Sequence, residues 1–530
     1  MDHRKQAVRF LIFASLVVLL QACSGSSSNN GGGTATGTTS VSLIDAPGDF
    51  DHVYITVKSL WFHTDPNVGP MDSAWVKRSL STPQMIDLLD FSNGAMSELW
   101  SNIHLPIGTY QQIRVELEPT YKTGPPSGHL YFNEVVTNGT SSAPLRIPDA
   151  EHGIKLTGLF AIAENTPLRL AIDFNAAEDI IDIGNGREFI LKPRLNYFDL
   201  DHAGAIIGTI DSGGTGTFIT DHHFVIKAER LATAQEMLDS GSTNTFYVVR
   251  RWTVPRAADG SFILYPVSTR VTNTWDIVVR GLDHQTVVIK DVPVTKGTTT
   301  ANVTSLGTIT MTAATNPDFE TAATITSPTG AWVQYYQRLP GEQYAHEIRF
   351  RHFPPLTGVI QNFELSNEPL QAGTYTTSLP ISLSTATAQE GVGGFQAVAG
   401  AILYTRSTTA SISSASTDTV VFSPLSVMSG WAAHSISGVI TMGSTTLPNG
   451  KLFVVRGGMI VNTMDVSSQM SSMMTRSYTM PNLPGGHPFA LYGVEAVGWS
   501  ATKVAVAVPA IADLSTGDAS SVNMNMIMLP

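Results

Sequence analysis

Gln112-Ile113-Arg114-Val115-Glu116-Leu117 alternates apolar and polar side chains, as expected of a β-strand with one face in a core. Residues 53–57, 168–172 and 189–192 show similar strand patterns. Clusters of Gly, Pro, Asn and Asp separate such runs, and the chain holds 45 Gly and 29 Pro in 530 residues. The sequence therefore predicts an all-β protein with several antiparallel β-sandwich domains in tandem.

Two segments are the best candidates for helices. Residues 82–100 have room for one or two short helices, and residues 232–238 have room for another. Asp87 and Asp90 lie in the first of these segments, in a Leu-rich context. We interpret them as caps of a helix start rather than as a catalytic carboxylate pair.

Residues 1–22 have the three parts of an export signal, which is removed from a mature protein. Basic residues precede an apolar run over residues 10–20, shorter than the roughly 20 residues that a membrane-spanning helix needs. Leu20-Gln21-Ala22-Cys23 then resembles the lipobox of bacterial lipoproteins. That resemblance implies cleavage before Cys23 and acyl chains on this residue, and two or more chains anchor a protein stably.

Cys23 is the only Cys in the chain, and lipidation would consume its thiol. The alternative is an ordinary signal with a Cys there by chance. Residues 24–39, SGSSSNNGGGTATGTT, read as a flexible tether with a mean reach of about 20–24 Å. Ser24 after the lipobox resembles the outer-membrane type of lipoprotein. We therefore expect a lipid-anchored protein of the bacterial envelope, on the outer membrane, either periplasmic or surface-exposed.

The charge balance argues against nucleic acid as a partner. The formal net charge is −12, and only 14% of residues are charged, whereas phosphate neutralisation requires a basic surface. The expected partners are the membrane, through the lipid on Cys23, and a protein or glycan at the cell surface.

Turn-rich joints divide the chain into four predicted domains after the signal (1–22) and the lipidated linker (23–39). They cover residues 40–201, 203–314, 315–430 and 434–530. The second and fourth look like distant copies, because both open with a Gly-containing strand, Gly204-Ala205-Ile206-Ile207-Gly208-Thr209-Ile210 and Ile436-Ser437-Gly438-Val439-Ile440.

Residues 41–196 resemble the bacterial domain-of-unknown-function family 4382. The resemblance depends on segments in the family's order, among them Val41–Pro47 (VSLIDAP), 51–57 (DHVYITV), 86–90 (IDLLD), 105–114 (LPIGTYQQIR), 153–156 (GIKL), 172–174 (IDF) and 190–193 (ILKP). It implies a surface or periplasmic lipoprotein and no known activity. The second and fourth domains resemble transthyretin-like, carboxypeptidase regulatory-like modules, which implies seven-stranded sandwiches used as spacers or binding modules.

Three carboxylates in DAPGDFD, residues 45–51, suggest a calcium site, with Asp45 and Asp51 as the first ligands to test. The alternative is a strand-ending turn in which Asp45 caps backbone amides. Otherwise we expect no cofactor. His346 and His352 would share one face of a strand about 20 Å apart, which is too far for one zinc ion.

Sequence motifs of hydrolases and nucleotide-binding enzymes are missing, including the nucleophile elbow and the P-loop. Trp61, Trp75 and Trp100 in the first domain, with Trp252 and Trp275 in the second, suggest a sugar-stacking face, although a place in the core is the alternative. We therefore expect no enzyme but a non-catalytic binding or scaffolding protein. The alternatives are a structural accessory subunit of an envelope assembly and a hydrolase whose active-site residues are dispersed in the sequence.

Overall fold

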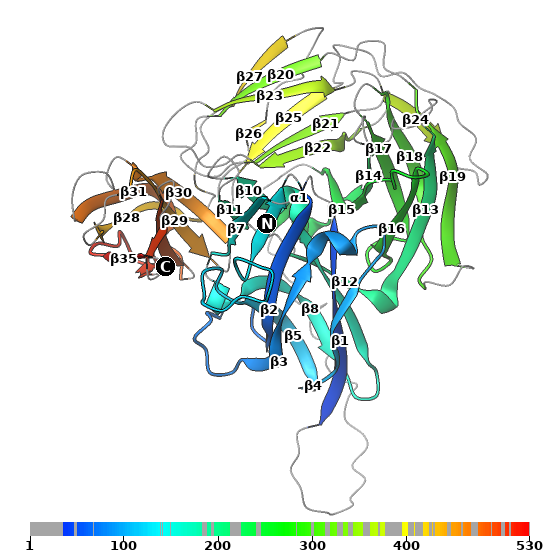
Figure 1. Cartoon of the computed structure of the whole chain (residues 1–530). Helices are drawn as coiled ribbons and strands as arrows, with labels where there is room; N and C mark the ends of the chain where they lie inside the picture. The colour runs from blue at the N-terminus through cyan, green and yellow to red at the C-terminus, as the bar shows by residue number, and fades with distance from the viewer. Residues whose placement is uncertain are drawn as a thin grey trace, which may run out of the picture. The chain divides into compact units, whose positions relative to one another are not determined.

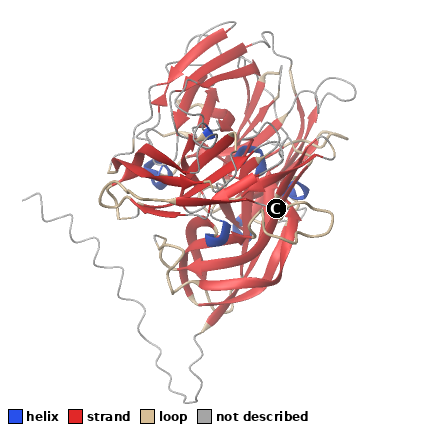
Figure 2. Ribbon diagram, turned by 60° about the vertical axis from the view of Figure 1, so that its left-hand side comes forward, coloured by secondary structure: helices blue, strands red, loops and turns tan. Residues whose placement is uncertain are grey.

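The computed structural model begins to describe the chain at residue 35, so residues 36–39 of the predicted tether already belong to a strand. It describes residues 35–46, 50–66, 68–137, 139, 141–148, 150–182, 188–191, 195–211, 224–239, 245–281, 284–297, 302–312, 319–325, 332–337, 343–352, 361–368, 372–376, 395–400, 407–408, 417–422, 427, 430–442, 447–456, 459–467, 475–488, 490–499, 504–507 and 510–528. The predicted signal and Cys23 lie outside these residues. Strands dominate, and the helices are short (Figure 2). The all-β prediction is therefore confirmed. Of the helices described, none is long and apolar enough to span a membrane.

The first sandwich encloses one core between two sheets (Figure 1). Its strands are β1 (Thr36–Ala46), β2 (His52–His63), β3 (Val76–Asp87), β4 (Ser97–Pro106), β5 (Gly108–Leu117), β6 (Glu134–Thr137), β7 (Ser141–Arg146), β8 (Ile154–Ile162), β9 (Leu168–Asn175), β10 (Ile180–Asp182), β11 (Phe189–Leu191) and β12 (Asn196–Asp199). One sheet has the order β12-β9-β1-β4, and the other has β10-β11-β7-β6-β2-β5-β8 with β3 beside β2. The alternating residues 112–117 lie in β5, where Ile113, Val115 and Leu117 belong to the core.

The helical prediction for residues 82–100 is wrong except for one short turn. This segment holds the end of β3, the 3-10 helix η1 (Leu88–Phe91) and the start of β4. β3 pairs with β2, and β4 pairs with β1, so sheet hydrogen bonds override the local helical preference. Asp87 caps η1 as predicted, because its Oδ1 accepts a hydrogen bond from Leu89 N at 3.2 Å.

The second predicted helix is confirmed as α3 (Ala234–Asp239). A capping box starts it. Glu236 N donates to Thr233 Oγ1 at 3.2 Å, and Thr233 N donates to Glu236 Oε2 at 2.8 Å.

The second sandwich begins directly after the first. Its strands are β13 (Ala203–Asp211), β14 (Val225–Leu231), β15 (Tyr247–Thr253), β16 (Ser261–Ser268), β17 (Thr274–Arg280), β18 (Thr286–Pro293) and β19 (Val303–Thr310). They form one sheet of order β16-β13-β19 and another of order β15-β14-β17-β18. The second sheet is extended by β24 (Ala372–Thr376), which comes from much later in the chain and pairs parallel with β18.

Two further groups of strands complete the described chain. The third group contains β20 (Phe319–Ile325), β21 (Trp332–Gln337), β22 (His346–His352), β23 (Gln361–Glu368), β25 (Phe395–Gly400), β26 (Ser407–Thr408) and β27 (Thr417–Phe422). The C-terminal sheet contains β28 (Ala432–Thr441), β29 (Asn449–Arg456), β30 (Met459–Asp465), β31 (Thr475–Gly485), β32 (Leu491–Trp499), β33 (Val504–Ala507), β34 (Ala510–Asp513) and β35 (Met524–Met528). The predicted strand over residues 346–352 is thus present as β22.

One pairing pattern recurs four times. β1, β13, β20 and β28 each have an antiparallel partner on one side and a later, parallel partner on the other. These pairs of partners are β4 and β9, β16 and β19, β23 and β27, and β31 and β35. The described chain therefore repeats one strand arrangement, although the sequence indicated a repeat only between the second and fourth domains.

Glycines in three of these opening strands lie against neighbouring backbone, and the closest approaches are in β28 and β13. A Cβ atom on Gly438 of β28 would lie 2.0 Å from Val522 O, and one on Gly204 of β13 would lie 2.1 Å from Thr295 O. A side chain at either position would therefore push two backbone segments apart.

We expect Gly438→Ala to lower the free energy of unfolding by about 1–3 kcal/mol, the usual cost of forcing atoms into a packed region. Denaturant unfolding of the whole chain measures this change. Gly517→Ala is the matched control, because a Cβ atom there would meet no atom within 4 Å. Equal stabilities of the two variants would contradict the close approach.

Candidate functional site

The junction between the first two sandwiches is very short. The 3-10 helix η3 (Leu200–His202) alone joins β12 to β13. Asp199 caps η3, because its Oδ1 accepts a hydrogen bond from Asp201 N at 3.0 Å. A connection of three residues with a fixed cap leaves the two sandwiches little freedom to turn against each other.

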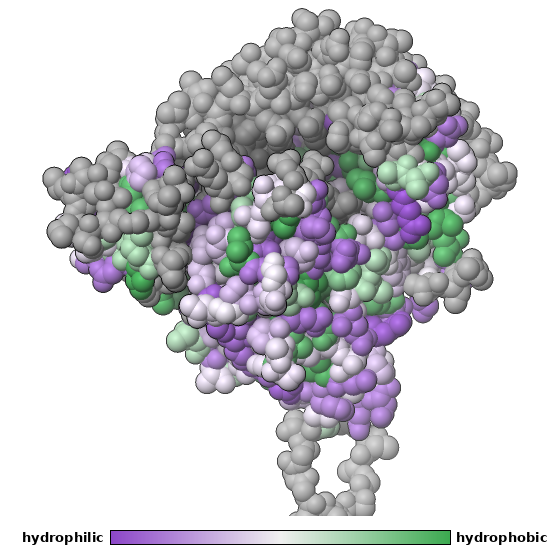
Figure 3. All heavy atoms as spheres, viewed as in Figure 1, coloured by the Kyte–Doolittle hydropathy of each residue, from purple (hydrophilic) through white to green (hydrophobic). Residues whose placement is uncertain are grey.

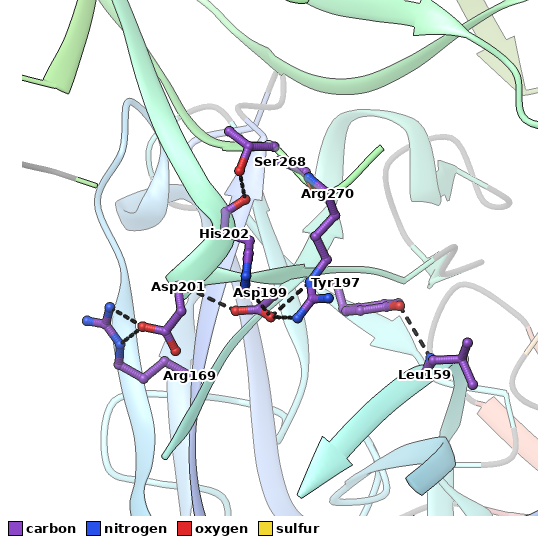
Figure 4. Close-up of polar contacts among 9 residues, drawn as sticks. Leu159, Arg169, Tyr197, Asp199, Asp201, His202, Ser268 and Arg270 are labelled. Carbon is purple, nitrogen blue, oxygen red and sulfur yellow. Dashed lines mark hydrogen bonds and ion pairs between the residues drawn. The ribbon is translucent and has the colours of Figure 1, made fainter. Parts of the chain in front are cut away.

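Asp199 also binds the second sandwich directly (Figure 4). Its Oδ2 accepts from Arg270 Nε at 3.0 Å, and the Nη2 of the same guanidinium also donates to it. His202 Nδ1 lies 3.1 Å from this oxygen. The His202 carbonyl in turn accepts from Thr269 N at 2.7 Å. A single buried carboxylate therefore connects the end of β12, the linker and the β16–β17 turn.

A more exposed pair lies beside it. Arg169 on β9 donates to Asp201 Oδ1 from Nε at 2.9 Å and from Nη2 at 2.5 Å. Their side chains are 59% and 37% exposed. Figure 4 shows this pair next to the Asp199 cluster. Because water screens such pairs, Arg169 and Asp201 add little to the strength of the junction.

The interior of the junction holds a buried ion pair. Arg251 on β15 donates from Nη1 to Asp173 Oδ1 on β9 at 2.9 Å, and the two side chains are 1% and 7% exposed. Arg251 also donates to the carbonyl oxygens of Asp45 and Tyr265, each at 3.1 Å. Burial raises the pKa of Asp173 to about 6, although Arg251 opposes this shift. The guanidinium thus ties two strands of the first sandwich to the second.

Apolar side chains continue the core across the junction. Ile44, Ala171, Phe198 and Leu200 come from the first sandwich and linker, and they pack with Ala203, Ala205 and Tyr265 of the second. Together with the buried ion pair, this cluster makes the two sandwiches one mechanical unit. The carboxylates of Asp173 and Asp199 accept bonds from fixed donors, so the arrangement is suited to holding domains together.

Comparison with known protein families identifies the first sandwich. Residues 36–193 match the family model of the domain of unknown function DUF4382. The predicted resemblance of residues 41–196 is thereby confirmed, and it places Asp45 and Asp173, which meet Arg251, inside the DUF4382 domain.

Comparisons with curated proteins and with solved structures give no further assignment. No curated protein matches the chain. One solved structure with some likeness is that of a point mutant of the shaft pilin spaA from Lactobacillus rhamnosus GG. The two sequences are 10% identical over the matched region, which includes 39% of this chain and 98% of the pilin chain. The TM-score is 0.18. A TM-score this low has no bearing on fold or function.

Further buried pairs join more distant segments. Arg146 of the DUF4382 domain donates to Glu495 of the C-terminal sheet at 3.0 Å, beside an apolar cluster of Ile181, Ile190, Phe453, Val455 and Val497. Lys227 of the second sandwich donates to Glu347 of β22, also at 3.0 Å. Contacts of the kind seen at the first junction are therefore repeated elsewhere in the described chain.

The structure gives Asp45 and Asp51 different partners. Asp45 is fully buried, and its Oδ1 accepts from Ala176 N at 2.9 Å. Asp51 is exposed, and its Oδ2 accepts from Gly139 N at 2.8 Å. Within the described ranges, no three His, Cys, Asp or Glu side chains form a group suited to a metal ion. Calcium binding by Asp45 and Asp51 stays a prediction, and an unchanged unfolding midpoint at millimolar calcium would reject it.

Two of the three tryptophans in the DUF4382 domain lie together on its outer face. The rings of Trp61 and Trp75 are 5.9 Å apart, and Lys77 Nζ lies 4.5 Å from the centre of the Trp61 ring. Trp100 instead packs against the core. Because Trp61 is almost fully buried and covered by Lys77, the sugar-stacking interpretation gains no support from its ring.

Glu116 binds several side chains on this outer face. Its carboxylate pairs with Lys58 at 2.8 Å and Lys77 at 2.6 Å, and it also accepts from Ser59 and Trp61. Although burial raises the pKa of Glu116, these donors together lower it to about 2. An acid with a lowered pKa stabilises the fold above its unfolded pKa of about 4.5, and this contribution disappears as pH falls towards 2.

We therefore expect Glu116→Gln to flatten the loss of stability between pH 4.5 and 2. Denaturant unfolding at a series of pH values measures this slope for wild type and variant. Glu98→Gln, at an exposed position of β4, is the control and should keep the wild-type slope. If the stability of Glu116→Gln fell with pH as steeply as that of wild type, Glu116 and its donors would not govern acid stability.

The sequence did not reveal the junction. Arg251 lies 78 residues from Asp173, and Arg270 lies 71 residues from Asp199. The one local signal was the sequence Asp199-Leu200-Asp201-His202, an acidic cap before a short turn at the predicted domain boundary.

Proposed function

We propose that this protein is a lipid-anchored scaffold of the bacterial envelope, which holds β-sandwiches in fixed orientation to bind a partner without catalysis. The buried Arg251–Asp173 pair is the observation that supports this most, because it fixes the second sandwich on the DUF4382 domain. A rigid junction is useful for presenting a surface at a set distance from a membrane. The lipid on Cys23 and the outer membrane as its location belong to the same proposal.

The polarity of the surface near the start of β1 is consistent with attachment through a lipid rather than through the folded domain. On the face drawn in Figure 3, mainly hydrophilic side chains cover the end of the first sandwich at which β1 begins. An end of this kind does not enter a bilayer by itself. In this proposal, membrane attachment depends on the acyl chains on Cys23.

We also propose that the second sandwich and the C-terminal sheet are transthyretin-like modules. Without the added strand β24, the two sheets of the second sandwich hold three and four strands, seven in all, and β28 repeats the pairing of β13. In this proposal they act as spacers or binding modules beside the DUF4382 domain.

The binding role is tested with the chain from residue 36 onwards, which forms one compact unit. It is immobilised and titrated with solubilised envelope fractions. We expect saturable retention of an envelope protein or glycan that the free chain displaces. Retention that is neither saturable nor displaced would contradict a binding function.

A further inference from the structure

The outer face of β14 carries charged side chains that are shielded from water. Ile226 and Ala228 of this strand belong to the core of the second sandwich, so Lys227 and Glu229 point to the opposite face. They are only 5% and 0% exposed, because β22 lies over them. The backbone N of Glu347 on β22 donates to Glu229 Oε2 at 3.2 Å. The lysine of β14 therefore meets side chains of another sheet instead of water.

The carboxylate of Glu347 contacts two groups that can react with each other. Its Oε1 accepts from Lys227 Nζ at 3.0 Å, and its Oε2 accepts from Gln334 Nε2 at 2.6 Å. Gln334 lies on β21, the strand that pairs with β22. A lysine amine is a nucleophile, and the carbon of a carboxamide is a carbonyl carbon that it can attack. One carboxylate thus holds a nucleophile and its target, one on each oxygen.

The oxygen of the same carboxamide has a donor of its own. Tyr336 Oη donates to Gln334 Oε1 at 3.0 Å. These residues are two positions apart on β21 and so share one face, and Tyr336 pairs with Glu347 across the β21–β22 ladder. Because a carboxylate only accepts hydrogen bonds, the amide nitrogen must face Glu347 and the amide oxygen must face Tyr336. The hydroxyl therefore lies where negative charge develops when the carbon is attacked.

Burial weakens the main obstacle to this attack, which is the proton on the amine. The side chains of Lys227 and Glu347 are 7% and 5% exposed. Loss of water disfavours the charged form of both groups, so a proton can pass from the ammonium to the carboxylate. The neutral amine then has the lone pair that nucleophilic attack requires.

We propose that the chain joins Lys227 to Gln334 by an isopeptide bond. Glu347 accepts a proton from the ammonium, and the neutral Nζ attacks Gln334 Cδ while Tyr336 Oη stabilises the oxyanion. Glu347 then gives its proton to Nε2 and accepts the surplus proton of Nζ as the bond between Cδ and Nε2 breaks. Nε2 leaves as ammonium, and Glu347 ends as a carboxylate. One C–N bond forms and one breaks, with no co-reactant.

The bond would connect β14 of the second sandwich to β21 of the third group of strands. It forms once in each chain and turns over no substrate. The proposal does not depend on the lipid anchor or on a partner, and its test does not measure either of them.

The mass of the denatured chain tests the bond. The chain from residue 36 onwards, which forms one compact unit, should be lighter than its sequence by one molecule of ammonia. Tandem mass spectrometry of a protease digest should find a branched peptide in which Lys227 Nζ is bonded to Gln334 Cδ. A wild-type chain with the full mass of its sequence would overturn the proposal.

Lys227→Arg keeps a positive charge beside Glu347 but has no amine, so it should have the full mass of its sequence. Lys77→Arg is the matched control at a lysine whose side chain is 42% exposed beside another buried glutamate, and it should keep the loss of ammonia. A loss of ammonia that persists in Lys227→Arg would overturn the proposal, since it would then come from another reaction.

Tyr336→Phe tests the donor to the oxyanion in a chain that keeps the amine, the carboxamide and the carboxylate. Mass spectra of samples taken at intervals after cell-free synthesis should show the bond forming about 10²–10³-fold more slowly than in wild type. Tyr335→Phe is the control, because its ring points to the opposite face of β21, and it should react at the wild-type rate. Equal rates in the two variants would contradict the role of Tyr336.

Discussion

Arg251→Ala is expected to lower the free energy of unfolding of the second sandwich and its junction by about 3–5 kcal/mol, the usual cost of removing one partner from a buried ion pair. Asp173 would then lose its guanidinium partner in an almost water-free interior, where it has to take up a proton or hold an unpaired charge. The carbonyl oxygens of Asp45 and Tyr265 would each lose a donor as well. Denaturant unfolding with a probe in each sandwich measures the loss.

The controls separate the ion pair from simple truncation of a long side chain. Arg169→Ala removes an exposed pair at the same junction and should cost less than about 1 kcal/mol. Arg251→Met combined with Asp173→Leu removes both charges together and should recover much of the lost stability. A similar loss in Arg169→Ala and Arg251→Ala would contradict the ranking of the two pairs by burial.

The same pair predicts a pH dependence. Burial raises the pKa of Asp173 to about 6, above its ordinary value of 3.8. The folded chain therefore holds this proton more tightly than the unfolded chain, and the contribution of this group to stability falls as pH rises from 3.8 through 6. Asp173→Asn should remove this part of the pH profile, which unfolding experiments between about pH 4 and pH 7.5 measure.

Cys23→Ser is expected to move the protein from the membrane pellet to the soluble fraction. Each buried methylene contributes about 0.8 kcal/mol, so the loss of two or more acyl chains removes the whole anchoring energy. The variant is expressed behind an ordinary cleavable signal, because an uncut apolar run would itself hold the chain in a membrane. Incorporation of labelled palmitate should disappear in parallel.

Ser27→Ala, also in the tether, is the control and should remain in the pellet with its label. Cys23→Ser that stays membrane-bound after its signal is cut would contradict the lipid anchor. Attachment through a partner protein would then be the better explanation, and salt or urea extraction of the pellet would reveal it.

Alternation of apolar and polar residues allowed the all-β architecture to be predicted, since it depends on neighbours in the sequence. Residues 112–117 form part of β5 because every second side chain can enter the core. Asp87 was also readable as a cap, since a cap binds amides two or three residues away. The helical prediction for residues 82–100 was wrong because the strands with which this segment pairs, β1 and β2, lie outside it in the sequence.

The candidate sites depend on contacts that no local pattern encodes. Arg251 meets Asp173, and Lys227 meets Glu347, only because the packing of sheets brings distant strands together. Glu347 was visible as part of a predicted strand, but its contact with Gln334 required the β21–β22 register. The sequence by itself determined strand content and an expected lipid anchor, because these follow from the order of neighbouring residues. Only the tertiary structure decided which charges are buried together, because desolvation and pairing depend on distances in space.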